Sequence, residues 1–212
     1  MKLLKVIEDA ASKIAPGRAP YFMEAHVVKA LSIIDNQGPV GRSKLAKTLG
    51  LGEGSIRTLG RHLEKEGLIE ISREGILLTS SGQNLVSNMR SNLSQPVEIP
   101  RGSLTVGTFN MAILVRGAAG AVRAGLEQRD AAIMFGALGA TTLIFSGGRM
   151  TMPYVEEDVF RDAPSVRETL VSQLKPQEND VIVIGSAPSR LVAEFGAIAA
   201  ALETLKTQES KV

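Results

Sequence analysis

The sequence predicts an α+β protein made of two small domains. Three observations predict it. Helical apolar spacing and a short hairpin pattern fill residues 1–94, a segment rich in Pro, Gly and Ser interrupts the pattern near 95–102, and apolar strand-like runs alternate with helical segments over 102–212. The chain has 212 residues, 44% of them hydrophobic and 22% charged, which is enough apolar material for two cores. We therefore place the domains at 1–94 and 102–212.

The composition excludes several classes of function. The chain has no Cys and two His in different segments, which excludes disulfides, thiolate zinc sites and cysteine nucleophiles and argues against a His-rich metal site. No apolar run is long enough to cross a bilayer, and Glu8 and Asp9 interrupt the first residues before a signal-peptide core develops. We expect a cytoplasmic protein with no membrane association, no metal site and no cofactor.

Helical periodicity dominates the first 65 residues. Residues 2–14 and 21–35 each carry apolar residues along one side and end at stretches rich in helix breakers. Residues 41–65 predict two further helices joined by the tight turn Gly50-Leu51-Gly52. In the second of these helices, spacings of three and four place the apolar residues Ile56, Leu59 and Leu63 on one face.

A hairpin and another helix complete the first domain. Gly67 suits a left-handed helix cap, and the apolar runs 68–72 and 76–79 predict two strands whose connecting turn carries Arg73 at its tip. Ser80 or Ser81 is a good N-cap for the helix that follows, which is expected to run to about residue 93.

Positive charge is concentrated in the first domain. Residues 1–94 contain 13 Lys/Arg and 9 Asp/Glu, whereas residues 95–212 contain 11 and 13. Residues 41–65 alone contain six basic and two acidic side chains. A helix with a buried apolar stripe and an outward face of Arg, Lys, Ser and Thr is suited to the major groove of DNA.

The order of these elements resembles a known DNA-binding fold. The phrases SKLAKTLGLGEGSIRTLGRHLEKEGLIE and ILLTSSGQNL carry the resemblance, and residues 22–85 are similar to the winged helix-turn-helix domain of bacterial and archaeal transcription regulators. The resemblance implies binding to double-stranded DNA, usually as a homodimer on a two-fold site. Some winged helices bind protein or RNA or only hold domains together, but the basic outward face favours DNA.

Residue types on this surface suggest distinct roles. Arg can grip the O6/N7 edge of guanine with two hydrogen bonds, so outward residues of the second helix are candidates for base edges or nearby phosphates. Residues of the preceding helix would clamp phosphates, and the wing tip would reach a neighbouring groove or the backbone. His62 is expected either beside this face or packed sideways. The predicted DNA-binding residues are Ser43, Lys44, Lys47, Ser55, Arg57, Thr58, Arg61, Lys65 and Arg73.

The second domain is predicted to contain about four strands and three or four helices. The strands are expected at 104–115, 141–145, 150–152 and 180–185, and the helices at 164–174, at 189–206 and within 116–140. A hairpin turn is expected at 146–149, where two glycines follow a serine.

Three places in this domain could bind a ligand. The first is the polar cluster around Gln128-Arg129-Asp130, which could equally be a helix cap with a salt bridge. The second is the strand-to-helix turn at Gly185-Ser186, whose backbone N–H groups could hold a phosphate or carboxylate, although it has no phosphate-loop motif. The third, 136–142, is attributed to packing. The predicted residues for a small anionic or polar effector are Arg116, Gln128, Arg129, Asp130, Gly185 and Ser186.

Further phrases resemble an uncharacterised archaeal family that joins a winged helix to a small α/β domain. They are APGRAP, GLEQRDAAIMFGALGATTLIFSGG and VIVIGSAP. The resemblance implies a winged helix-turn-helix domain followed by a small mixed α/β domain and an archaeal origin, and it implies no activity.

The leading hypothesis is a transcription regulator, not an enzyme, whose second domain senses a small molecule, dimerises, or both. One alternative is an enzyme of unknown reaction with a fused regulatory winged helix. Another is a protein-interaction module of the transcription machinery. The arm at 2–14 and the helix at 81–93 are the two candidates for the homodimer contact.

Overall fold

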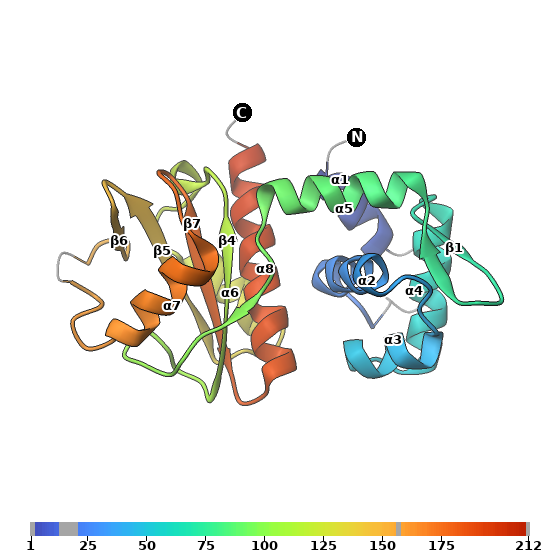
Figure 1. Cartoon of the computed structure of the whole chain (residues 1–212), viewed down its shortest axis with the longest axis horizontal. Helices are drawn as coiled ribbons and strands as arrows, with labels where there is room; N and C mark the ends of the chain where they lie inside the picture. The colour runs from blue at the N-terminus through green and yellow to red at the C-terminus, as the bar shows by residue number, and fades with distance from the viewer. Residues whose placement is uncertain (1–2, 13–20, 156–157, 211–212) are drawn as a thin grey trace. The chain divides into compact units, whose positions relative to one another are not determined.

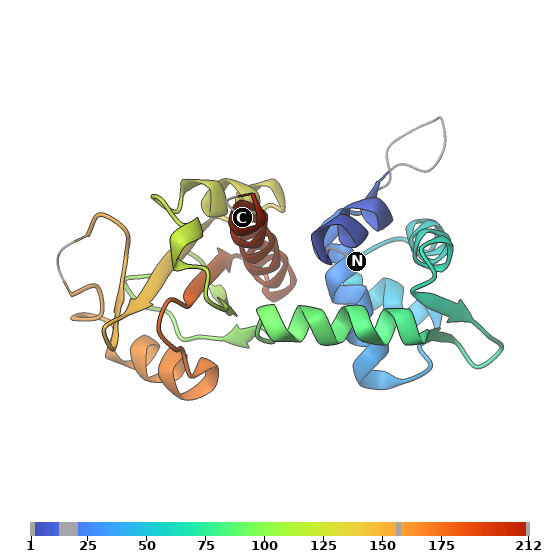
Figure 2. The same ribbon diagram turned by 90° about the horizontal axis from the view of Figure 1, so that it is seen from above.

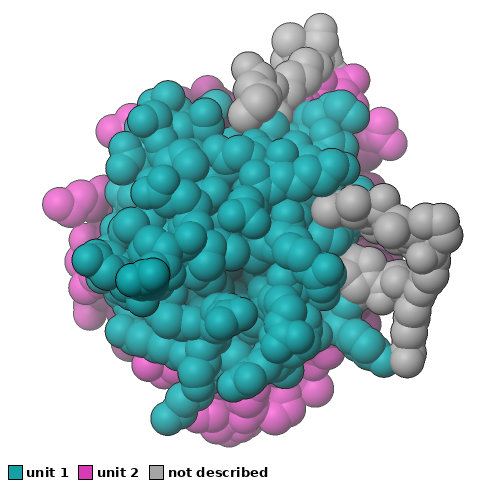
Figure 3. All heavy atoms as spheres, turned by 90° about the vertical axis from the view of Figure 1, so that its right-hand side faces the viewer, with its two compact units in different colours: residues 1–90 teal, residues 91–212 magenta. Residues whose placement is uncertain are grey.

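A computed structural model describes residues 3–12, 21–155 and 158–210. The chain divides into two compact units, Met1–Arg90 and Ser91–Val212, which we call unit 1 and unit 2 and which Figure 3 colours separately. The division lies slightly before the Pro-rich stretch at 95–102, because the residues after position 90 pair with the second unit.

Unit 1 consists of helices and a short hairpin (Figure 1). The order α1, α2, α3, α4, β1, β2, α5 confirms the predicted elements. The first helix is shorter than predicted, and the expected Ile14 and the breaker stretch at 15–20 lie outside the described residues. The bounds are α1 Leu3–Ala11, α2 Glu24–Gln37, α3 Arg42–Leu49, α4 Glu53–Lys65, β1 Ile69–Ile71, β2 Ile76–Leu78 and α5 Ser80–Asn92.

The core of unit 1 is made by the apolar stripes of its helices. Ile56, Leu59 and Leu63 of α4 are fully buried, as their spacing predicted. The apolar stripe of α3 and the apolar side of α2 pack into the same core as these residues of α4. Helix α1 packs against α2 and α4. Burying these large side chains removes apolar surface from water and fixes which face of α4 remains outside.

The wing is a two-stranded antiparallel hairpin with Ile69 opposite Leu78. Gly67, at φ +67°, takes the left-handed conformation expected between α4 and β1. On the other edge of β2, the Val40 N–H donates to the Ile76 carbonyl (3.0 Å) and the Ile76 N–H donates to the Val40 carbonyl (2.9 Å). These bonds tie the wing to the connection between α2 and α3.

Unit 2 is an antiparallel five-stranded sheet in the order β3-β4-β7-β5-β6, with helices on both faces. Figure 2 shows α7 on one face and α6 with α8 on the other. The central strand β7 is buried along its whole length. The bounds are β3 Val97–Glu98, β4 Phe109–Val115, η1 Ala119–Ala121, α6 Leu126–Met134, β5 Gly139–Ser146, β6 Arg149–Thr151, α7 Pro164–Leu174, β7 Val181–Ala187 and α8 Arg190–Glu209.

The two faces of the sheet have different cores. Ile182 and Ile184 of β7 point into an apolar cluster with Val166 and Leu170 of α7. On the opposite face, Gly185 lies directly under α8: a Cβ at this position would be 2.5 Å from the Ala193 carbonyl oxygen. The absence of a side chain lets the helix lie against the strand.

Two predictions for unit 2 need correction. The strand expected over 104–115 begins only at Phe109, because the chain at Gly107 crosses close to the backbone of Ala187 instead of pairing along a neighbour. The expected break at 95–102 contains the edge strand β3, which pairs with β4. The hairpin turn is confirmed, since Gly147 and Gly148 both have positive φ, as a tight turn between twisted strands requires.

Candidate nucleic-acid interface

A tight turn between α3 and α4 sets the position of the second helix. Gly50 is left-handed (φ +66°), and its N–H donates to carbonyls of the last turn of α3. The Leu51 N–H donates to the Ala46 carbonyl at 3.1 Å, which closes the turn. Helix α4 then begins after Gly52, and its buried stripe leaves the opposite face in contact with solvent.

All nine predicted DNA-binding residues reach the surface of unit 1. Ser55 and Thr58 are half-buried, and the other seven are exposed. The residues lie on α3, on α4 and at the wing. Helices α3 and α4 meet at the Gly50–Gly52 turn, and the Val40–Ile76 pairing joins the wing to the segment before α3.

The basic side chains of this surface are not neutralised. Among the described residues, no carboxylate lies within ion-pair distance of any of five basic residues: Lys44, Lys47, Arg57, Arg61 and Lys65. Cations without internal partners leave their charge available to an external anion. A surface of this type suits the phosphates of a duplex.

Thr58 differs from the other residues of the surface. Its hydroxyl donates to the Gly54 carbonyl one turn earlier, at 3.1 Å. The hydroxyl proton is therefore engaged by the helix, and Thr58 offers an acceptor oxygen and a methyl group to the outside. The methyl group is suited to apolar contact with a thymine methyl.

The wing tip has a mixed charge. Arg73 is exposed between β1 and β2, but the exposed Glu70 and Glu74 stand near it in the sequence. The Ser72 N–H donates to the Gly75 carbonyl at 2.9 Å and holds the tip closed. We therefore assign most of the positive potential of unit 1 to α3 and α4 and a lesser part to the wing.

Neither histidine belongs to the interface. His62 lies on α4 but points inward: its Nδ1 donates to the Ala10 carbonyl at 3.0 Å, and its ring meets Phe22 edge to face. His26 is buried near the start of α2, and its Nδ1 accepts the Met23 N–H at 3.2 Å. Of the two positions open for His62, the sideways packing is the one that the structure shows.

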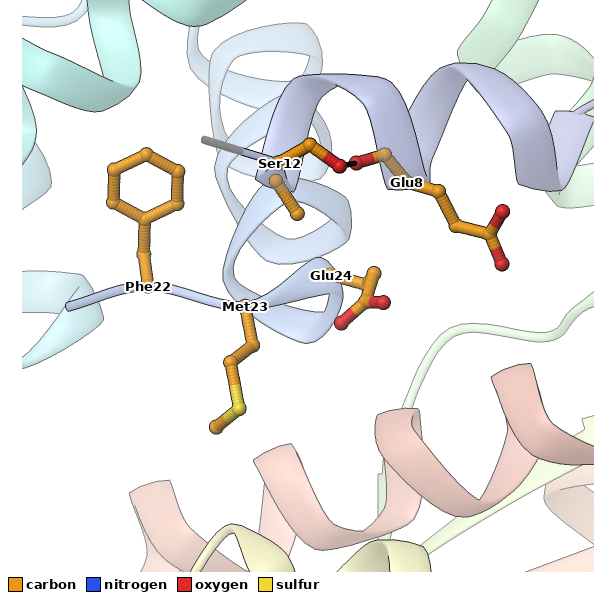
Figure 4. A pocket seen from close by; sticks show the side chains of 6 residues that line it. Glu8, Ser12, Phe22, Met23 and Glu24 are labelled. Atoms are coloured by element: carbon orange, nitrogen blue, oxygen red, sulfur yellow. Dashed lines mark hydrogen bonds between the residues drawn. The ribbon is translucent and has the colours of Figure 1, made fainter. Parts of the chain in front are cut away.

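A pocket of about 320 Å³ opens between the end of α1 and the start of α2 (Figure 4). Glu8, Ser12, Phe22 and Glu24 are among the residues that line it, and the Ser12 hydroxyl donates to the Glu8 carbonyl. The two carboxylates make this pocket unsuited to phosphate, so we keep it apart from the basic surface.

The six predicted effector residues do not form a single site in unit 2. Arg116 follows the last residue of β4, whereas Ser186 pairs with Asn110 near the first. Six residues of strand separate these positions, which is about 20 Å. Arg129 and Asp130 are exposed and form an ion pair with each other, at 3.1 Å between Nη2 and Oδ1.

Gly185 and Ser186 are both engaged inside unit 2. Gly185 is covered by α8, and the Ser186 hydroxyl donates to the side-chain oxygen of Asn110 at 2.7 Å. The first turn of α8 has its own cap, since Ser189 accepts the Val192 N–H at 3.3 Å. The Ser186 hydroxyl and the Val192 N–H are therefore already engaged within unit 2.

Gln128 is the exception in this set. It is 1% exposed on the inner side of α6, and its Oε1 accepts no hydrogen bond within the described structure. The Oγ1 of Thr142 on β5 is also buried and has no hydrogen-bond partner within the described structure. Thr142 lies within residues 136–142, which were attributed to packing because a threonine in a strand is ordinary. Buried polar atoms without partners are uncommon and call for a water or a ligand.

No group of three or more potential metal-ligating side chains occurs among residues 3–12, 21–155 and 158–210. Across the same ranges, no helix combines the length and the apolar character that crossing a membrane requires.

Comparisons with known proteins give separate matches for an N-terminal and a C-terminal segment of the chain. Residues 26–93 match the family described as the CggR N-terminal DNA binding domain, and residues 106–205 match a domain of unknown function, DUF4443. The solved structure of the hypothetical protein PH0730 from Pyrococcus horikoshii OT3 is 27% identical, with a TM-score of 0.65, and the match covers 85% of this chain and 98% of that one. No match was found among curated proteins.

These matches confirm the expected architecture. Residues that match the CggR N-terminal DNA binding domain precede residues that match DUF4443, and a Pyrococcus horikoshii protein of nearly the same extent has a similar structure.

Proposed function

We propose that this chain is a transcription regulator that binds double-stranded DNA sequence-specifically through α3, α4 and the wing. The observation that carries the proposal is the group of exposed, unpaired cations on α3 and α4 of a domain that matches a DNA-binding family. Helix α4 enters the major groove, because its buried stripe leaves a face of Ser, Thr and Arg outward.

The surface divides into residues that read bases and residues that hold phosphates. Ser55, Arg57 and Arg61 lie on α4 and are assigned to base edges. Ser43, Lys44 and Lys47 on α3 are assigned to phosphates, with Lys65 and Arg73 at the margins. Thr58 contributes an acceptor or a methyl contact, since its proton is held by Gly54.

We assign regulation, and no catalysis, to unit 2. It acts by dimerising or by binding a small polar effector that favours one state of the protein over another. For an effector, the supporting observation is the pair of buried oxygens without partners, on Gln128 and Thr142. Mass spectrometry of small molecules released from the native protein tests this part: a stoichiometric polar compound supports it, and its absence leaves dimerisation as the assigned role.

The central experiment selects duplexes from a random pool with the full chain. We expect one enriched motif, because the base-reading face of α4 is rigidly placed by its buried stripe, and a homodimer makes that motif two-fold symmetric. The Arg57→Ala variant should lose about 1–3 kcal/mol of discrimination at one base position in each half-site. The Arg167→Ala variant, which removes an exposed cation from α7 of unit 2, is the matched control and should select the same motif. A pool without enrichment would refute sequence-specific binding.

A further inference from the structure

Helix α6 of unit 2 has its large apolar side chains on the outside. Its buried residues are Gln128 and the small Ala132, which faces Gly196 of α8. Its exposed residues include Leu126 (52% exposed), Ile133 (45%) and Met134 (75%). This is the reverse of the usual pattern for a helix on a sheet, whose large apolar residues face the core.

Exposed apolar residues also occur just beyond the end of α6. Leu138, at 55% exposure, follows the helix directly, and Val106, at 63%, lies next to Gly139 at the start of β5. Half of the ten large apolar side chains that the described residues expose are in this group. A gathering of this size on one surface marks a contact site, whereas single exposed apolar residues do not. We define the α6 face as Val106, Leu126, Arg129, Asp130, Ile133, Met134 and Leu138.

The charges within the α6 face identify its partner. Arg129 and Asp130 are the charged residues at its centre, Glu127 is a further exposed charge at its margin, and Leu126, Ile133 and Met134 lie one turn away from the central pair on either side. Their ion pair joins neighbours in sequence and is half exposed, so it contributes little to the stability of one copy. A two-fold axis through this point would bring Arg129 of each copy to Asp130 of the other and apolar residues to apolar residues.

We propose that the α6 face is the surface through which two copies of this chain form a homodimer. The proposal deepens the proposed function and rests on it. If the chain binds a two-fold DNA site, it needs two winged helices, and a homodimer supplies them. It also replaces the two earlier candidates. The apolar residues of α1 are buried against α2 and α4, and neither α1 nor α5 exposes a large apolar side chain among its described residues.

Two charge-reversed variants test the contact in trans by sedimentation equilibrium of the full chain. Arg129→Asp gives each copy two acidic residues at the centre of the face, and Asp130→Arg gives each copy two basic ones. Each variant alone should be monomeric, with a dimer Kd raised at least about 100-fold by like-charge repulsion. An equimolar mixture of the two should form a heterodimer, because the charges are again complementary. Variants that dimerise alone as the wild type does would overturn the proposal.

A substitution of the apolar part gives a second readout. Met134→Glu places a charge on the most exposed residue of the face and should abolish the dimer without changing the circular dichroism spectrum of the folded chain. Val171→Glu makes the same kind of change on α7, outside the face, and should leave the dimer intact. If both variants dimerise equally, the face is not the interface. Wild-type protein that stays monomeric in the sedimentation cell also overturns the proposal.

The outcome separates this inference from the proposed function. Wild-type protein that binds its selected duplex but is monomeric refutes the dimer and leaves DNA binding in place. Protein that dimerises through the α6 face but binds no duplex supports the dimer and refutes DNA binding. The Met134→Glu variant should bind a single half-site with weakened affinity for the full two-fold site, because the second winged helix is no longer tethered.

Discussion

Acidification should destabilise unit 1 through His26. Burial lowers the pKa of His26 from 6.5 to about 4; a backbone hydrogen bond at Met23 opposes part of this shift, and the charge of Lys29 adds to it. The Met23 N–H donates to its Nδ1, which requires that nitrogen to be unprotonated. Because the folded-state pKa lies below the unfolded one, the loss of stability begins as the pH falls below 6.5 and is complete near pH 4.

The size of this effect follows from the two pKa values. The difference between the unfolded-state and folded-state pKa values lowers the free energy of unfolding by about 3 kcal/mol once the pH is below both pKa values. About 2 kcal/mol of this loss occurs between pH 7 and pH 5. The assay is urea unfolding of the full chain at both pH values, followed by circular dichroism.

The matched control for His26 is the His26→Gln variant. Glutamine offers a carbonyl oxygen to the Met23 N–H and does not titrate, while every other ionisable group is unchanged. The wild type should lose about 2 kcal/mol more than the variant between pH 7 and pH 5. Equal losses in the two proteins would refute the assignment of a buried, neutral His26.

Three further substitutions test the packing described above. Gly185→Ala should cost about 3 kcal/mol or more in unfolding experiments, because its Cβ would be 2.5 Å from the Ala193 carbonyl oxygen of α8; a loss below 1 kcal/mol would contradict that close approach. His62→Phe keeps the ring but removes the hydrogen bond to Ala10 and should cost about 1 kcal/mol and speed amide exchange in α1; unchanged exchange would contradict the tether. Gln128→Met should stabilise effector-free protein by about 1 kcal/mol, and a loss would show that its amide is satisfied.

Periodicity predicted unit 1 well because its helices are two-sided. The stripe of Ile56, Leu59 and Leu63 is buried as its spacing indicated, and the charged residues between them are outside. Turn chemistry predicted the connections for a similar reason: a left-handed glycine such as Gly50 has a local cause that the sequence displays. The position of His62 could not be derived, because its partner Ala10 lies 52 residues away.

The second unit was harder to predict because its determinants are long-range. Gly107 interrupts the expected strand because β7 passes beside it; a glycine within a strand pattern indicates a bulge or a close approach, but it does not identify the neighbour. The effector residues were predicted at separate places along the chain, and the pairing that sets Arg116 and Ser186 at opposite ends of the β4–β7 ladder is long-range. The exposure of Ile133 and Met134 was not predicted either, because apolar residues in a helix are ordinarily assigned to a core.

The salt dependence of DNA binding tests the central claim most directly. The measurement is the affinity of the full chain for its selected duplex, by fluorescence anisotropy, across a series of salt concentrations. If Lys44 and Lys47 hold phosphates, the Lys44→Ala/Lys47→Ala variant should bind more weakly and its plot of log K against log salt should be shallower by about 2, at 0.9 per phosphate. The Arg167→Ala control should keep the wild-type slope. Equal slopes in the double variant and the wild type would contradict the assignment of α3 and α4 as the DNA-binding surface.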